Sequence, residues 1–150
     1  MTPTPLTPTQ VAAINRLVRA GKLERVAPDV PKAERFLAQA VEGIAETANV
    51  TATNVRYAVA YDAAHACGEA ILAAYGIRTV NGPGQHAALG DTLLVIFPDP
   101  PAAAAARHYD RMRMARNDIH YRAKSVGSGP STAALAAATT LLQATTAQLQ

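Results

Sequence analysis

The segment from residue 51 to residue 75 constrains the fold most strongly, because apolar side chains would surround a helix of this sequence on nearly every side. Many of its residues are alanines, and the larger apolar residues do not keep to one face: Val55, Tyr57, Val59, Tyr61, Cys67, Ile71 and Leu72. A helix that is apolar all round is buried by its neighbours. We therefore predict that residues 51–75 form the central helix of a bundle.

Further helices are predicted around this central one. The helical spacing of apolar residues indicates these helices, and capping residues and prolines mark their ends. The first helix is predicted from Thr7 or Thr9 to Gly21, and the others over 31–48, 86–96, 102–124 and 131–148. The segments 21–31 and 76–86 contain glycine and proline and are predicted to be loops. Residues 92–97, TLLVIF, could form a buried strand, but no partner strand is evident. The predicted fold class is all-α, an antiparallel helical bundle of five or six helices.

The length of 150 residues indicates a single domain. Residues 1–9 are rich in proline and threonine and are predicted to be a flexible N-terminus, followed by a helical domain over 10–150. The single cysteine, Cys67, cannot build a disulfide framework. No apolar run reaches the roughly 18 to 20 residues of a membrane span, and the first residues lack a signal-peptide pattern. We expect a cytoplasmic protein that does not enter a membrane.

Positive charge is concentrated in residues 107–124, RHYDRMRMARNDIHYRAK. This stretch holds six of the 14 lysines and arginines and only two acidic residues, whereas the rest of the chain has nine acidic residues against eight basic ones. A local basic patch attracts polyanions more effectively than a modest net charge spread over the surface. We therefore expect the 102–124 helix to be the functional surface.

Four polar side chains of this helix share one face, because Arg113, Arg116, Asn117 and His120 are spaced as i, i+3, i+4 and i+7. An imidazole can transfer protons near neutral pH, and guanidinium groups bind a phosphate and stabilise its developing negative charge. These groups meet the needs of metal-independent RNA cleavage through the 2′-hydroxyl. The alternative is a solvated basic face, relieved by Asp110 and Asp118, on which His120 is incidental.

The central helix has one polar stripe, formed by Asp62, His65 and Glu69. Its donor types are those of a metal site, but the same side chains could pair with arginines of the basic helix. The glycine-containing stretch NGPGQH lacks the lysine of a phosphate-binding loop and follows no predicted strand, so a turn that places His86 near the next helix start is expected. The apolar surroundings of Cys67 favour inert burial.

Three stretches resemble the HEPN domains, which are small helical proteins that include RNase toxins and non-catalytic modules. They are GKLERVAPD, YDAAHACGEAILAAYGIRTVNGPGQH and ARNDIHYR. The last resembles a branch with Arg-Asn, three residues and Tyr, which here are Arg116, Asn117 and Tyr121. RNase members have Arg, four to six residues and His, with a polar residue after the Arg. Arg113 and His120 match this spacing, whereas the polar neighbour Asn117 follows Arg116.

The resemblance implies a toxin-like endoribonuclease that needs no metal or cofactor and is a homodimer with facing motif helices. It implies catalytic roles for His120 as general acid and base, for Arg113 and Arg116 on the phosphate, and for Asn117 in orienting it. Side chains expected to bind RNA are Arg107, Arg111, Tyr121, Arg122 and Lys124. A nucleotidyltransferase-type antitoxin is an expected partner, and Tyr121 could be its target. The alternative function is a non-catalytic HEPN module that binds RNA, a nucleotide or a protein.

Overall fold

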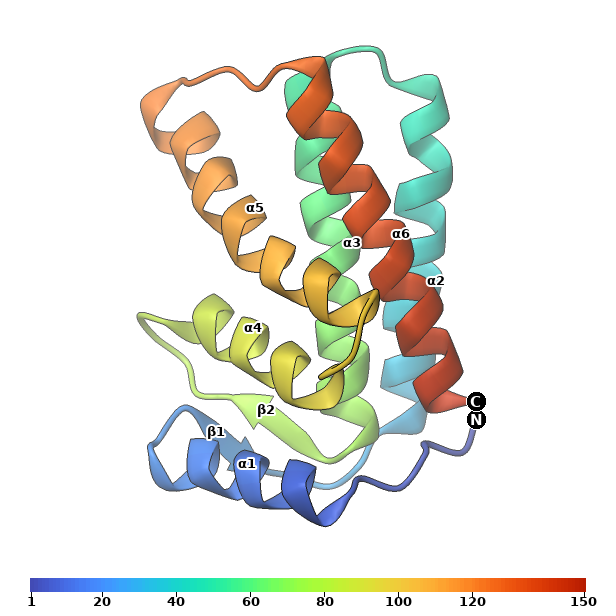
Figure 1. Cartoon of the computed structure of the whole chain (residues 1–150), viewed down its shortest axis with the longest axis vertical. Coiled ribbons are helices and arrows are strands. Elements are labelled where there is room, and N and C mark those ends of the chain that lie inside the picture. The colour runs from blue at the N-terminus through green and yellow to red at the C-terminus, as the bar shows by residue number, and fades with distance from the viewer.

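The computed structural model describes residues 1–150 and is built almost entirely of helices (Figure 1). The six α-helices are α1 (Pro8–Arg19), α2 (Val30–Glu46), α3 (Thr53–Ala74), α4 (Gln85–Ile96), α5 (Ala102–Arg122) and α6 (Ser128–Leu149). A 3-10 turn follows α2 at Thr47–Asn49, and two short strands are β1 (Leu23–Arg25) and β2 (Ile77–Thr79). The predicted all-α helical bundle is confirmed.

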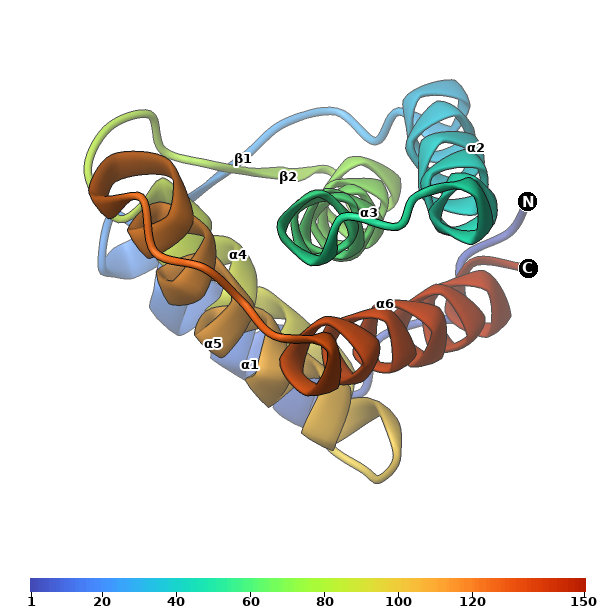
Figure 2. The ribbon, with the colours of Figure 1, turned by 90° about the horizontal axis from the view of Figure 1, so that it is seen from above.

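Helix α3 lies at the centre of the molecule, as its apolar sequence predicts. Viewed from above, it stands between α2, α6 and the group formed by α4 and α5 (Figure 2). Tyr57, Tyr61 and most residues from Ala63 to Ala74 are buried, and Cys67 has no exposed surface. Burial raises the pKa of the Cys67 thiol to about 12, so this group is an inert thiol in the core at neutral pH.

Some of the predicted capping residues mark the observed helix ends, and one does not. Thr7 caps α1 in a capping box with Gln10, and Gly21, with a φ of +74°, follows that helix in the left-handed conformation that glycine tolerates. The predicted cap Ser131 is wrong, because α6 begins one turn earlier after Gly127. Ser131 is instead buried, and its hydroxyl donates to the carbonyl oxygen of Thr53.

The two strands correct the prediction that 21–31 and 76–86 are loops throughout. β1 and β2 pair antiparallel, with Glu24 opposite Arg78 and a 2.7 Å ion pair between those side chains. A strand of three residues is too short to show a periodic pattern, and its partner is far away in the sequence. The pairing forms because the ends of α3 and α1 bring the two segments together, with Leu23 and Ile77 buried against the core.

The two ends of the chain lie side by side (Figure 1). The Thr4 backbone N–H donates to the carbonyl of Gln148 at 2.8 Å, and the Tyr75 hydroxyl donates to the Thr4 carbonyl at 2.6 Å. The segment before α1 is thus anchored at Thr4, while the flexibility expected for residues 1–9 stays a prediction about motion. None of the six helices combines the length and the hydropathy required to cross a membrane.

Candidate active site between the central and basic helices

Helix α5 packs one face against the core and turns its charged face outward. Tyr109 and Met112 are fully buried, and Ile119 is half-buried. Ala123 is exposed at the C-cap, with a φ of +52°. The packing of Tyr109 and Met112 fixes the rotation of α5 about its axis, and this rotation places Arg113 and Arg116 at the boundary between core and solvent.

Four aromatic side chains from three helices meet beneath this boundary, and we call them the Tyr–His cluster: Tyr61 and His65 of α3, His86 of α4 and Tyr109 of α5. The Tyr61 hydroxyl lies 2.6 Å from Nδ1 of His86 and 3.4 Å from the Tyr109 hydroxyl. The Tyr109 hydroxyl lies 2.9 Å from Nδ1 of His65. The imidazole rings of His65 and His86 lie 4.6 Å apart between centroids. The four side chains therefore form a closed ring of contacts.

Burial keeps the two tyrosines of this cluster uncharged at neutral pH. It raises the pKa of both tyrosines, so each hydroxyl keeps its proton and can donate one hydrogen bond. The pKa of His86 is lowered, first by burial and then by electrostatic interaction with His65, Arg116 and Arg113. A neutral imidazole has one nitrogen free to accept a proton, which is the state that a general base requires.

Two arginines of α5 border the cluster. The guanidinium carbon of Arg116 lies 5.3 Å from the ring centroid of Tyr61, and its Nε lies 3.7 Å from a carboxylate oxygen of Asp62. This ion pair confirms that an acidic residue of the central helix meets an arginine of the basic helix. Arg113 is held one turn away by Asp110, with its Nε and Nη2 at 3.0 and 2.9 Å from the same oxygen.

A cavity of about 270 Å³ opens between the start of α4 and the arginine face of α5. Its lining residues are Gly82, Gly84, Gln85, His86, Ala87, Arg113 and Asn117. No side chain caps α4, whose N-cap Gly84 has a φ of +84°, so first-turn N–H groups remain available to an anion. A helix N-terminus, a guanidinium, an amide and an imidazole together suit the binding of a phosphate group.

The predicted site residues divide into two sets. Arg113 and Asn117 line this cavity, and Arg107 lines an adjoining one together with Arg113. His120 does not line it, because it is exposed one turn further along α5 and meets Tyr121 edge-on, with 4.7 Å between the ring centroids.

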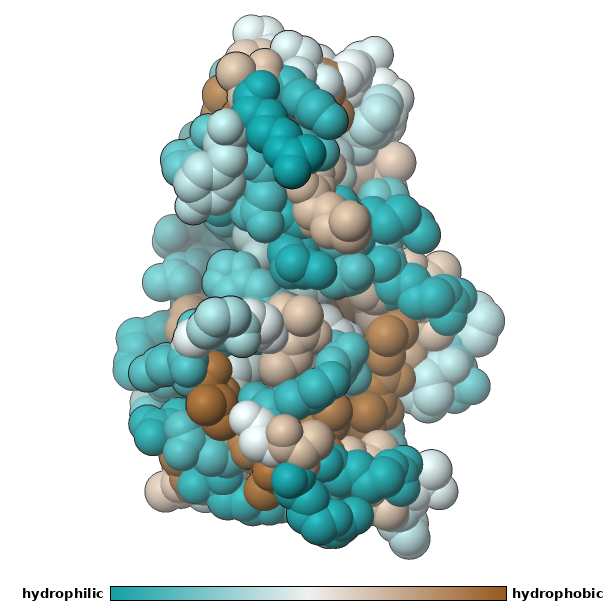
Figure 3. Space-filling view, turned by 90° about the vertical axis from the view of Figure 1, so that its left-hand side faces the viewer, coloured by the Kyte–Doolittle hydropathy of each residue, from teal (hydrophilic) through white to brown (hydrophobic).

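The other predicted RNA-binding side chains lie away from the cavity. Arg122 and Lys124 pair with Asp118 at 3.5 and 3.6 Å, and Arg111 lines a groove toward α6 together with His108. Tyr121 is 78% exposed. Seen from the left-hand side of Figure 1, the face that contains the C-terminal half of α5 is mostly hydrophilic in its upper part (Figure 3).

The sequence alone did not single out His86 or the two tyrosines as site residues. Tyr61, His65 and Glu69 follow one another at intervals of four on α3, so this polar line on an apolar helix was a usable signal. No comparable signal exists for His86, because its position depends on how α4 crosses α3 and α5. Asp62, His65 and Glu69 do not together form a group of three that could hold a metal ion.

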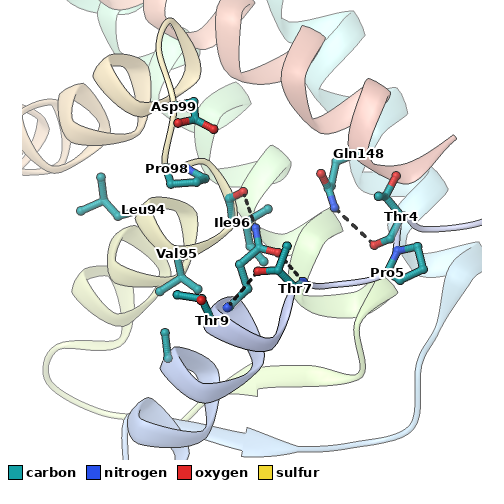
Figure 4. Close-up of a pocket in the computed structure, with 12 residues that line it drawn as sticks. Thr4, Pro5, Thr7, Thr9, Leu94, Val95, Ile96, Pro98, Asp99 and Gln148 are labelled. Carbon is teal, nitrogen blue, oxygen red and sulfur yellow. Dashed lines mark hydrogen bonds between the residues drawn. The ribbon is translucent and has the colours of Figure 1, made fainter.

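A larger cavity of about 530 Å³ lies between the N-terminal segment, α1 and the end of α4 (Figure 4). The side chains of Thr7, Gln10 and Gln148 are already bound within the chain. Gln10 accepts from the Thr7 N–H and donates to the Ile96 carbonyl, and Gln148 donates to Thr4 (Figure 4). Asp99 is its only charged lining residue, so this cavity does not suit an anionic substrate.

No family model matches the chain, and neither a curated protein nor a solved structure matches it.

Proposed function

We propose that the protein is a cytoplasmic, metal-independent endoribonuclease of the HEPN type, acting as the toxin-like half of a toxin–antitoxin pair. The observation that carries the proposal is the cavity in which His86 meets Arg113 and Asn117 at the N-terminus of α4. A second candidate is a non-catalytic module that binds RNA, a nucleotide or a protein through the same basic face. The exposed position of His120, outside this cavity, favours the second candidate.

In the catalytic proposal, the scissile phosphate binds at the first turn of α4. Arg113 and Asn117 contact its oxygens, and Arg116 adds positive charge from the next turn of α5. His86 takes the proton of the 2′-hydroxyl as general base, because its lowered pKa leaves it neutral at pH 7. The 2′-oxygen bonds to phosphorus as the bond to the 5′-oxygen breaks, and the leaving 5′-oxygen takes a proton from water. His86 thus has the role that the sequence motif gives to His120.

Exposed side chains further along α5 suit single-stranded RNA. Tyr121 follows Asn117 by one helical turn, which is about 6 Å along the axis, and its exposed ring can stack on an unpaired base. Arg107 extends the positive surface in the other direction, toward the adjoining cavity. His120 lies against Tyr121 and would contact the same nucleotide.

The proposed partners of the protein follow the HEPN resemblance. A second copy would face the first across the α5 helices, and the large apolar side chains exposed on this helix, Met114 and Tyr121, support such an interface. A nucleotidyltransferase-type antitoxin would modify Tyr121, whose hydroxyl makes no hydrogen bond within the chain and is open to solvent.

The test is incubation of the purified protein with mixed single-stranded RNA in EDTA. Cleavage is expected, with His86→Ala lowering the rate by about 10² to 10⁴, the range that a general base contributes. His108→Ala is the matched control, because this partly buried histidine of α5 faces α6 instead of the cavity. A rate that depends on His120 and not on His86 would refute the assignment of the base. Absence of cleavage with retained RNA binding would establish the non-catalytic module.

A further inference from the structure

The Tyr–His cluster extends beyond its four rings, because Nε2 of His65 lies 3.4 Å from a carboxylate oxygen of Glu69. A line of polar contacts therefore starts at the cavity, passes through two buried tyrosines and ends at the partly exposed Glu69: His86, Tyr61, Tyr109, His65 and Glu69. Tyr61 and Tyr109 are at most 2% exposed, so water does not compete for their hydroxyls. The number of protons along this line decides which atom donates at each contact.

The direction of donation is set at the Glu69 end. The negatively charged carboxylate of Glu69 lies nearest to Nε2 of His65, so in the neutral imidazole it favours a proton on that nitrogen over a lone pair. Its Nδ1 is then an acceptor, and the Tyr109 hydroxyl donates to it at 2.9 Å. The reverse arrangement would set the Nε2 lone pair of His65 against the carboxylate of Glu69, which is electrostatically unfavourable.

The remaining contacts follow from one proton per hydroxyl. The Tyr109 hydroxyl uses its proton in the hydrogen bond to His65, so its oxygen accepts from the Tyr61 hydroxyl at 3.4 Å. The Tyr61 oxygen must then accept from His86, whose Nδ1 lies 2.6 Å away. If Tyr61 donated to His86 instead, two buried phenolic oxygens would face each other with no proton between them.

We propose that Glu69, acting through His65, Tyr109 and Tyr61, fixes His86 in its Nδ1–H tautomer and so leaves Nε2 as the basic atom of a side chain that lines the cavity. Glu69 and Tyr109 are therefore positioning residues for the general base. The consequence for RNA cleavage rests on the proposed function, whereas the tautomer is a property of the protein alone.

The charges around His86 are consistent with this assignment. From α5 it faces Arg113 and Arg116, which oppose a second proton on the imidazole. From α3 it faces Tyr61, His65 and Glu69, of which only Glu69 favours protonation, and does so least among the groups that act on it. The neutral ring is thereby the relevant form, and its tautomer decides which nitrogen is basic.

The experiment is a long-range ¹H–¹⁵N correlation spectrum of uniformly ¹⁵N-labelled protein at pH 7.5, which distinguishes the two tautomers by nitrogen shift and coupling pattern. His86 is expected as the Nδ1–H form, which free histidine disfavours. Tyr109→Phe should convert it to the Nε2–H form, because Tyr61 can then donate only to His86. Tyr75→Phe is the matched control, since that hydroxyl binds Thr4 and Gln148 outside the cluster.

A second variant tests the same inference if Tyr109→Phe does not fold. Glu69→Met removes the acceptor at the other end of the line and should also move His86 toward Nε2–H. An Nε2–H tautomer in the unaltered protein, or an Nδ1–H tautomer that survives both substitutions, would overturn the inference. Because no RNA is present, this result is independent of cleavage. Failure of the RNA assay with an Nδ1–H tautomer would refute the proposed function and leave the positioning network intact.

Discussion

Two imidazoles, His86 and His108, lie in surroundings that disfavour their protonated forms. Partial burial lowers the pKa of each, and electrostatic interactions lower it further, with Arg111 for His108 and with His65, Arg116 and Arg113 for His86. In the unfolded chain these histidines titrate near pH 6.5. The unfolded state therefore binds protons at a higher pH than the folded state, which links protonation to stability.

The free energy of unfolding is accordingly expected to fall as the pH is lowered through 6.5 toward the lowered pKa values of the folded state, and the loss is complete below them. This is measured by urea unfolding at a series of pH values. Since carboxylates also titrate in this range, the comparison is between variants: His86→Gln should flatten the dependence, whereas His120→Gln, which lies outside the Tyr–His cluster, should not. An equal pH dependence in the His86→Gln variant would contradict the assignment.

At the scale of elements, α4 crosses α3 at a glycine. A Cβ atom at Gly68 would overlap the side chain of Leu89, whereas a Cβ at Gly43 of α2 would meet only ordinary contacts, the nearest at 3.6 Å. The absence of a side chain at Gly68 lets the start of α4 approach α3, so that His86 reaches Tyr61. This crossing therefore positions the candidate base.

Gly68→Ala is expected to destabilise the protein by about 1 to 3 kcal/mol, because Leu89 must move within a filled core. Gly43→Ala is the matched control and should be stabilising by about 0.5 to 1 kcal/mol, the usual gain for replacing glycine within a helix. Urea unfolding of the purified variants measures both changes in the free energy of unfolding. Equal effects of the two substitutions would show that the crossing tolerates a methyl group and would weaken its role in placing His86.

At the scale of the whole molecule, α5 presents large apolar side chains to solvent. Met114 is 58% exposed and Tyr121 is 78% exposed, and they stand seven residues apart on the same helix. A self-complementary interface between two copies would bury Met114 and Tyr121 of both chains at once. Such an interface would bring the two basic faces together at its edges, in agreement with the proposed homodimer.

Sedimentation velocity is expected to show twice the chain mass of 15.7 kDa. Met114→Asp should produce monomers, because it places two like charges close to the two-fold axis of the interface. Val41→Asp is the control, since Val41 is 53% exposed on α2, away from α5. A monomer before substitution, or a dimer that persists in Met114→Asp, would argue against an interface on this helix.

Half of the candidate site could be predicted from the sequence. The i, i+3, i+4 spacing placed Arg113, Arg116 and Asn117 on one face of a helix, and the structure brings Arg113 and Asn117 to the cavity. His120 shared that face in the prediction, but one turn of α5 carries it past the start of α4. The spacing of residues along a helix determines which face of the helix each side chain is on. How far along that face a neighbouring helix extends depends on tertiary packing.

The sequence by itself determined the helices and the central place of α3, because an apolar surface all round a helix can only be buried, and this pattern is local. The tertiary structure alone decided which imidazole joins the arginines. His86 reaches the cavity because α4 packs closely over Gly68 and the paired strands β1 and β2 turn the chain toward it. These contacts join residues that are distant along the chain, and no periodic pattern in the sequence records them.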